Sequence, residues 1–166
     1  MFTIRSLSDT DRPWVRQWMI GHWGAELMIV HGEQLYPAEY PGFVAQAGTD
    51  VVGLVTYTLR GDECEILSLD SLTESQGIGS ALIESVRKAA LENGARRLWL
   101  ITTNDNVNAL RFYQKRGFEL VKIHRHAIDE SRKLKASIPV LGNFGIPLRD
   151  EIELEMLLTS GDAGLG

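Results

Sequence analysis

The sequence has little cysteine: Cys64 is the single one among 166 residues. One thiol cannot close a disulfide within the chain, and it excludes a metal cluster built on several cysteines. Such sparse cysteine usage is typical of proteins in a reducing compartment. We therefore expect a cytoplasmic location.

Long apolar runs and concentrated charge are absent as well. No uninterrupted apolar stretch reaches the roughly 20 residues of a membrane-spanning helix, and the first five residues, MFTIR, contain no apolar leader segment. The 22 acidic and 17 basic residues give a net charge of −5 without a long run of either sign. We therefore expect no membrane partner and no nucleic-acid partner.

The chain has enough apolar residues for one substantial core. Hydrophobic residues make up 44% of the 166 positions, which suits a single domain. We place that domain at residues 1–158. Residues 159–166 are mostly small and polar, and we expect a flexible tail there.

Strand and helix patterns alternate along the domain. The predicted strands are residues 2–7, 43–47, 51–60, a segment that begins at Glu63, and residues 96–103, 118–128 and 151–158. The predicted helices begin near Pro13, Ile78 and Asn106 and end at Gly21, Asn93 and Gly117. The connections predict an antiparallel meander followed by a parallel strand pair, and hence an α/β (α+β) fold with a mixed, mostly antiparallel sheet and flanking helices.

Some segments have a less regular pattern. Trp14 and Trp18 lie one helical turn apart, and we expect both in the core. Residues 22–42 are either an ordinary surface loop or a loop that contacts a ligand, with Trp23, Glu39 and Tyr40 among its candidate contacts. We expect a long loop with about one helical turn at residues 129–150.

The strand at 151–158 alternates apolar residues with three glutamates. We expect it to be exposed and able to pair across a dimer, although the glutamates oppose such pairing. Monomer and homodimer therefore both stay open.

A glycine-rich turn lies between the strand that begins at Glu63 and the helix that begins at Ile78. Its residues are Gln76, Gly77, Ile78, Gly79 and Ser80. Glycines let the backbone approach a ligand closely, and a helix N-terminus favours an anion. The turn predicts a phosphate or pyrophosphate site, and a simple tight turn is the alternative.

A second run of residues adds specificity to this prediction. It consists of Asn106, Ala109, Phe112, Tyr113, Gly117 and Phe118 in fixed register. Together with the glycine turn and the order of the elements, this run resembles the GNAT family of N-acetyltransferases, and the resemblance covers nearly the whole chain. It implies the GNAT fold, in which two parallel strands splay apart, and acetyl-CoA as cosubstrate.

The sequence departs from the family pattern at the start of the glycine turn. Glu74 stands where the family usually has Gln or Arg, and Ser75 replaces a common glycine. A carboxylate beside a pyrophosphate is repulsive. We therefore expect Glu74 to point to solvent.

The resemblance also implies roles for single residues. The main chain of Leu69 and the backbone of the glycine turn hold acetyl-CoA. Tyr113 is the general acid near its sulfur. Asn106 contacts the cofactor, caps a helix, or does both, and Asn104 is a weaker candidate.

The base is less well defined by the sequence. The resemblance implies a glutamate of this strand as the base, with Glu65 the preferred candidate and Glu63 the alternative. The two lie two residues apart and therefore share a face unless a bulge intervenes. Two solvent-facing carboxylates are the other interpretation. His124 and His126 also alternate onto one face, but no third ligand completes a metal site, so we expect no metal. Cys64 is expected to be a packed residue.

The predicted activity is transfer of an acetyl group from acetyl-CoA to a primary amine of a small molecule. The alternatives are acetylation of a protein N-terminus or lysine, and a non-catalytic module that binds acyl-CoA. The acidic residues between His22 and Pro41 slightly favour a cationic acceptor.

Overall fold

The computed structural model describes residues 1–73 and 76–159. Glu74, Ser75 and the predicted tail beyond Thr159 lie outside the described residues. The chain forms two compact units. Of the described residues, the first unit comprises 1–27, 36–73, 76–98 and 157–159, and the second comprises Met28–Leu35 and Trp99–Met156.

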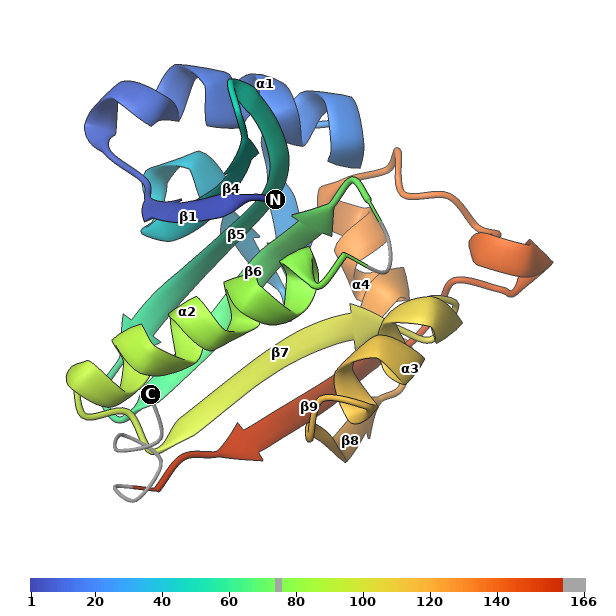
Figure 1. The fold of residues 1–166 in the computed structure, drawn as a ribbon. Coiled ribbons are helices and arrows are strands. Elements are labelled where there is room, and N and C mark those ends of the chain that lie inside the picture. The colour runs from blue at the N-terminus through green and yellow to red at the C-terminus, as the bar shows by residue number, and fades with distance from the viewer. Residues whose placement is uncertain (74–75, 160–166) are drawn as a thin grey trace. The chain divides into compact units, whose positions relative to one another are not determined.

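The first unit holds an antiparallel sheet with the strand order β1-β4-β5-β6 (Figure 1). Its elements are β1 (Thr3–Ser6), η1 (Asp9–Asp11), α1 (Arg12–Trp23), η2 (Pro37–Glu39), β4 (Gly42–Ala47), β5 (Asp50–Arg60), β6 (Glu63–Ser71) and α2 (Ile78–Glu92). The predicted meander of three strands is confirmed. Gly48 forms the first turn with a φ of 63°, a conformation that glycine adopts without strain.

Helix α2 packs on one face of this sheet. Ile78, Leu82, Val86 and Ala90 are buried at helical spacing, as the sequence predicts. Gly53 of β5 lies beneath the helix, because a Cβ there would sit 2.7 Å from Ile78 Cγ2 and 3.0 Å from Leu82 Cδ1. The alternate residues of β5 and β6 therefore face the opposite side of the sheet.

Helix α1 is longer than the sequence predicts. It continues through Gly21 and ends at Trp23, where Gly24 has a φ of 82° and donates its N–H to Ile20 O at 3.0 Å. Val15 and Met19 form its buried face. The core assignment of Trp14 and Trp18 was wrong: both are half-buried, and their indole N–H groups donate to the carboxylates of Asp11 and Asp70.

The second unit contains a short hairpin, a group of three strands and two helices. Its elements are β2 (Met28–Val30), β3 (Glu33–Leu35), most of β7 (Arg97–Thr103), α3 (Val107–Gln114), β8 (Glu119–His124), α4 (Ala127–Leu134), η3 (Asn143–Gly145) and nearly all of β9 (Glu151–Leu157). Residues 28–35 thus form a hairpin, within the segment whose pattern was least regular.

Strand β9 lies between β7 and β8. The expectation of an exposed last strand was therefore wrong, and Glu151 at its start is 2% exposed. The edge strand is β8, which pairs with β9 alone within its unit and has a bulge between Leu120 and Lys122. A bulge and a lysine on an edge strand both discourage pairing with another chain.

The predicted strand at 118–128 ends early, at His124. His126 has a φ of 62° and precedes α4, so it does not share a strand face with His124. Each imidazole has its own carboxylate: His124 Nε2 lies 3.0 Å from Glu153, and His126 Nδ1 lies 2.9 Å from Asp129. Within the described part of the chain, no cluster of His, Cys, Asp and Glu could hold a metal ion.

Among residues 1–73 and 76–159, no helix has both the length and the apolar character to cross a bilayer.

Candidate active site

A bulge in β6 determines which side chains share a face of the first unit. Thr56 pairs with Ser68 and the next residue, Tyr57, pairs with Ile66, so Leu67 is the extra residue. Because of this bulge, Glu65, Ser68 and Asp70 project from the face opposite α2.

The two candidate bases are in different environments. Glu65 is 3% exposed, whereas Glu63 at the start of β6 is half-buried. Glu63 also forms an ion pair with Arg97, with 3.4 Å between Oε1 and Nη1. The bulge lies beyond both glutamates, so they share one face as expected. Glu65 is thus the more buried of the two glutamates on this face.

The polar face of β6 also carries a hydrogen-bonded pair of hydroxyl groups. Thr56 Oγ1 and Ser68 Oγ are 2.6 Å apart, and both residues are almost completely buried. This hydrogen bond fixes the side chain of Ser68, the residue that follows the bulge. Leu69, the residue expected to contact acetyl-CoA through its main chain, lies opposite Val55.

The glycine turn leads into the N-terminus of α2. Gly77 has a φ of 77°, and among the described residues, its chain neighbours aside, no atom lies within 4 Å of the position where its Cβ would be. Ala81 N donates to Gly77 O at 3.0 Å as the helix starts, so the amide groups before Ala81 have no acceptor within the helix. Gln76 and Ser80 are exposed, and the side chain of Ile78 is buried against β5. The first backbone N–H groups of a helix have no acceptor within that helix, and such an N-terminus fits a phosphate-bearing ligand.

Helix α3 holds the candidate acid in the second unit. Asn106 caps it, since Asn106 Oδ1 accepts from Ala109 N at 3.2 Å. Tyr113 is 8% exposed, and its ring makes edge contacts with Phe112 and Phe118 at centroid distances of 5.1 and 5.4 Å. The aromatic residues of the second motif therefore fix the ring of Tyr113.

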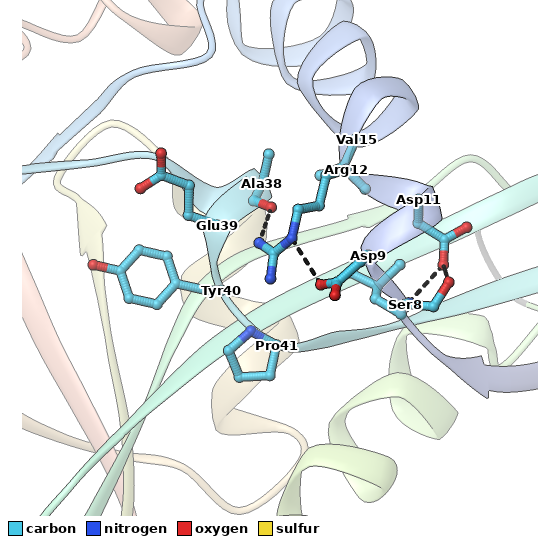
Figure 2. A pocket seen from close by; sticks show the side chains of 10 residues that line it. Ser8, Asp9, Asp11, Arg12, Val15, Ala38, Glu39, Tyr40 and Pro41 are labelled. Atoms are coloured by element: carbon cyan, nitrogen blue, oxygen red, sulfur yellow. Dashed lines mark hydrogen bonds and ion pairs between the residues drawn. The ribbon is translucent and has the colours of Figure 1, made fainter.

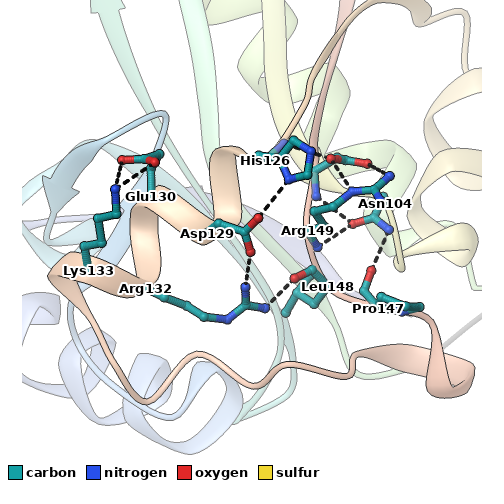
Figure 3. A network of polar contacts seen from close by, with 10 residues as sticks. Asn104, His126, Asp129, Glu130, Arg132, Lys133, Pro147, Leu148 and Arg149 are labelled. Carbon is teal, nitrogen blue, oxygen red and sulfur yellow. Dashed lines mark hydrogen bonds and ion pairs between the residues drawn. The ribbon is translucent and has the colours of Figure 1, made fainter.

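Asn104 fastens a neighbouring segment of the second unit (Figure 3). Its Oδ1 accepts from Arg149 N at 3.0 Å and Asp150 N at 2.9 Å, and its Nδ2 donates to Pro147 O at 2.8 Å. Its amide group thus satisfies backbone groups of this loop, and the cofactor role of Asn104 stays a prediction.

The next residue, Asp105, fastens the same loop farther along. It is 5% exposed, and its carboxylate accepts from Thr103 Oγ1 and, at 2.8 Å, from Asn143 N. A Cβ on Gly142 would collide with this carboxylate, which explains the glycine. Arg132 of α4 adds hydrogen bonds to three carbonyl groups, those of Ile138, Pro139 and Leu148. The expected loop at 129–150 is thus an eight-residue helix followed by a fixed segment.

The first unit also contains a cavity of about 220 Å³ beside the start of α1 (Figure 2). Arg12 reaches across it to Asp9 Oδ1 at 3.1 Å and Ala38 O at 2.8 Å. The lining residues are Leu7, Ser8, Asp9, Asp11, Arg12, Val15, Ala38, Glu39, Tyr40 and Pro41. Glu39 and Tyr40 thus line a cavity, as a ligand-contacting loop would, but Trp23 lies elsewhere, beside Asp70.

Cys64 has the character of a packed residue. It is fully buried, and burial, with a smaller effect of the Glu65 charge, raises the pKa of its thiol to about 12. Because the thiolate is the reactive form, this thiol is a poor nucleophile at neutral pH.

We expect Cys64 to resist a thiol reagent in the folded protein. At pH 7.5, dithionitrobenzoate should label less than about a tenth of the protein in an hour, and one thiol per chain in guanidinium chloride. Free glutathione at the same concentration serves as the control for reagent activity. Complete labelling of the folded protein within minutes would show that the thiol is accessible and ionised.

Comparison with known proteins identifies the family. Residues 6–118 match the family model of the acetyltransferase (GNAT) family. The uncharacterized protein YdhI of Bacillus subtilis (strain 168) is 43% identical over 132 residues, which cover 79% of this chain and 82% of the relative.

Solved structures share the fold. An IAA acetyltransferase from Bacillus cereus ATCC 14579 has a TM-score of 0.75 at 22% identity, covering 95% of this chain and 100% of that one. A Bacillus subtilis acetyltransferase in complex with CoA has a TM-score of 0.68 at 19% identity, covering 96% and 100%. The resemblance inferred from the two motifs is thus confirmed, and the chain belongs to the GNAT family of acetyltransferases.

Proposed function

We propose that this protein transfers the acetyl group of acetyl-CoA directly to a primary amine of a small-molecule acceptor. The bulged strand β6 carries the proposal. It presents the buried carboxylate of Glu65 on one face, and the chain after it leads to a helix N-terminus with a glycine turn. A base and an anion site on consecutive elements suit an acyltransferase that uses a phosphate-bearing donor.

Several residues are proposed to hold acetyl-CoA. The glycine turn, from Gln76 through Gly77, Ile78 and Gly79 to Ser80, fits its pyrophosphate because it leads into the N-terminus of α2, and a helix N-terminus favours an anion. The main chain of Leu69 and the side chains of Asn104 and Asn106 are the further proposed contacts. When bound, acetyl-CoA supplies a thioester carbonyl carbon, which forms a C–N bond to the amine as its C–S bond breaks.

Two side chains are proposed to move protons. Glu65 accepts the proton that the acceptor ammonium must lose, directly or through a water molecule. The Tyr113 hydroxyl donates a proton to the departing sulfur. Glu63 is the alternative candidate for the base, and its carboxylate forms an ion pair with Arg97.

Thermal unfolding with acetyl-CoA tests cofactor binding. A ligand present at about 100 times its Kd stabilises the folded state by roughly 2.7 kcal/mol, and for a chain of this size we expect the Tm to rise by about 5 °C or more. Acetylated pantetheine, which lacks the pyrophosphate, should give a smaller shift because it cannot use the glycine turn.

Thiol release with a panel of amines then tests catalysis. Release that depends on both acetyl-CoA and an amine would support the proposed transfer. If acetyl-CoA raises the Tm but no amine causes thiol release, the result would instead favour a binding module. If millimolar acetyl-CoA does not change the Tm, the enzyme proposal would be wrong.

A further inference from the structure

The most unusual polar contact of the first unit lies between α1 and the end of β6. Trp18 Nε1 donates to Asp70 Oδ2 at 3.0 Å, and Trp23 Nε1 donates to the same oxygen at 2.9 Å. Two indole groups from one helix thus hold one oxygen of a half-buried carboxylate. The other oxygen, Oδ1, receives no hydrogen bond from the residues that the structure describes.

The indoles orient Asp70 without neutralising it. Indole N–H groups are uncharged donors, so they add no positive charge beside the carboxylate. Within residues 1–73 and 76–159, no basic side chain forms an ion pair with Asp70. A carboxylate that is partly removed from water and has no counter-ion attracts a cation.

Aromatic surface surrounds this carboxylate. Trp23 is 42% exposed, which leaves part of its ring available to a ligand. Trp18 stacks on His22 at 4.1 Å and meets the edge of Trp14 at 6.1 Å, so its orientation is fixed. Tryptophan is the aromatic side chain that attracts cations most strongly, and a carboxylate beside it adds to the attraction.

Asp70 and the proposed base lie on the same face of the sheet. Their partners on β5 are Leu54 and Thr58, four residues apart, so the two backbone positions are separated by about 13 Å. Both side chains extend from that face. An acceptor with two amines can therefore place one at Glu65 and the other at Asp70.

We propose that Asp70, with Trp18 and Trp23, binds the second, positively charged nitrogen of an aliphatic diamine acceptor. This inference rests on the proposed function and specifies its substrate class. Asp70 supplies charge through Oδ1, Trp23 supplies a ring face, and Trp18 keeps the carboxylate in place. An acceptor with a single amine gains nothing from this subsite.

The test compares diamines with monoamines of equal chain length. Unmodified protein should acetylate the preferred diamine with a kcat/KM at least about tenfold above that of the matched monoamine. Asp70→Asn retains an oxygen for the indoles but removes the charge. It should raise KM for the diamine about tenfold or more, with kcat and the monoamine KM nearly unchanged.

Two further variants separate recognition from folding. Asp62→Asn removes an exposed charge in the turn before β6 and should leave both KM values unchanged. Trp23→Phe removes one indole donor and should also weaken diamine preference, so it tests the subsite even if Asp70→Asn fails to fold.

Each outcome bears on a different conclusion. Equal kcat/KM values for diamine and monoamine would overturn the subsite while leaving the acetyltransferase proposal intact. An Asp70→Asn variant that raises both KM values equally would do the same. Acetylation of no amine at all would overturn both proposals.

Discussion

Replacing Tyr113 by phenylalanine is expected to lower kcat about a hundredfold, because the variant loses the hydroxyl that we propose protonates the departing sulfur. Phenylalanine keeps the ring, which is 8% exposed and packed against Phe112 and Phe118. We therefore expect the Tm to change by less than about 3 °C and the affinity for acetyl-CoA to change by less than about threefold.

Tyr57→Phe provides a matched control for this experiment. Tyr57 is also 8% exposed, and its side chain lies on the α2 side of the sheet, opposite the face with Glu65. The same chemical change there should leave kcat within about twofold. Steady-state thiol release gives kcat, and calorimetric titration gives the affinity for acetyl-CoA.

The pH profile adds a second criterion. A tyrosine that acts as an acid must be protonated, so kcat of the unmodified enzyme should fall at alkaline pH, and Tyr113→Phe should lack this decrease. A Tyr113→Phe variant with unchanged kcat would exclude the hydroxyl as the acid. An equal decrease of kcat in Tyr113→Phe and Tyr57→Phe would indicate a general effect of removing a buried hydroxyl.

Local motifs made the ends of several elements predictable. The glycine turn before α2, the Asn106 cap of α3 and the Gly48 turn each involve residues within a few positions of one another. Backbone conformation there depends on glycine or on a short side-chain hydrogen bond, and both can be identified in the sequence. The glycine turn and the Asn106 cap also belong to the candidate site.

Tertiary contacts explain what the sequence did not reveal. The Trp18 and Trp23 bonds to Asp70 span 52 and 47 residues, and the Asn104 bonds to the 147–150 segment span 43 to 46. No local spacing encodes such pairs. Strand β9 was misjudged for the same reason, since its place between β7 and β8 depends on distant strands.

The end of β8 shows how one residue can redirect the chain. Apolar residues from Phe118 to Ile128 predicted a single strand. The positive φ of His126 ends the extended conformation, and Asp150 Oδ1 accepts the His126 N–H at 2.9 Å and stabilises the turn. Because Asp150 is 24 positions away, the pattern of the strand alone gave no sign of it.

Replacing Asp11 by asparagine is expected to lower the free energy of unfolding by about 3 kcal/mol at pH 7. Asp11 is 6% exposed and accepts two hydrogen bonds from Arg5, at 2.8 and 3.0 Å, and one from Trp14 at 2.8 Å. It also accepts the Ser8 N–H at 2.7 Å, and so joins β1 to the start of α1. The variant weakens all these contacts by removing the charge, and urea denaturation measures the loss.

The effect of Asp11 should depend on pH in a defined direction. Its hydrogen bonds, above all those from Arg5, hold the pKa of Asp11 well below its usual value in the folded state. A lowered folded-state pKa stabilises the protein above the unfolded-state pKa of about 3.9, and this stabilisation is lost as the pH falls below that value. The difference between the unmodified protein and Asp11→Asn should therefore shrink between about pH 4 and pH 2.

Asp9→Asn is the matched control in the same turn. The Asp9 side chain is 91% exposed and contacts only Arg12 among the described side chains, so its replacement should change stability by less than about 0.5 kcal/mol at either pH. Asp150, whose pKa is also lowered, destabilises every variant equally in acid and cancels from the comparison. An Asp11→Asn difference that is equally large at pH 7 and pH 3 would mean that shape rather than charge makes Asp11 important.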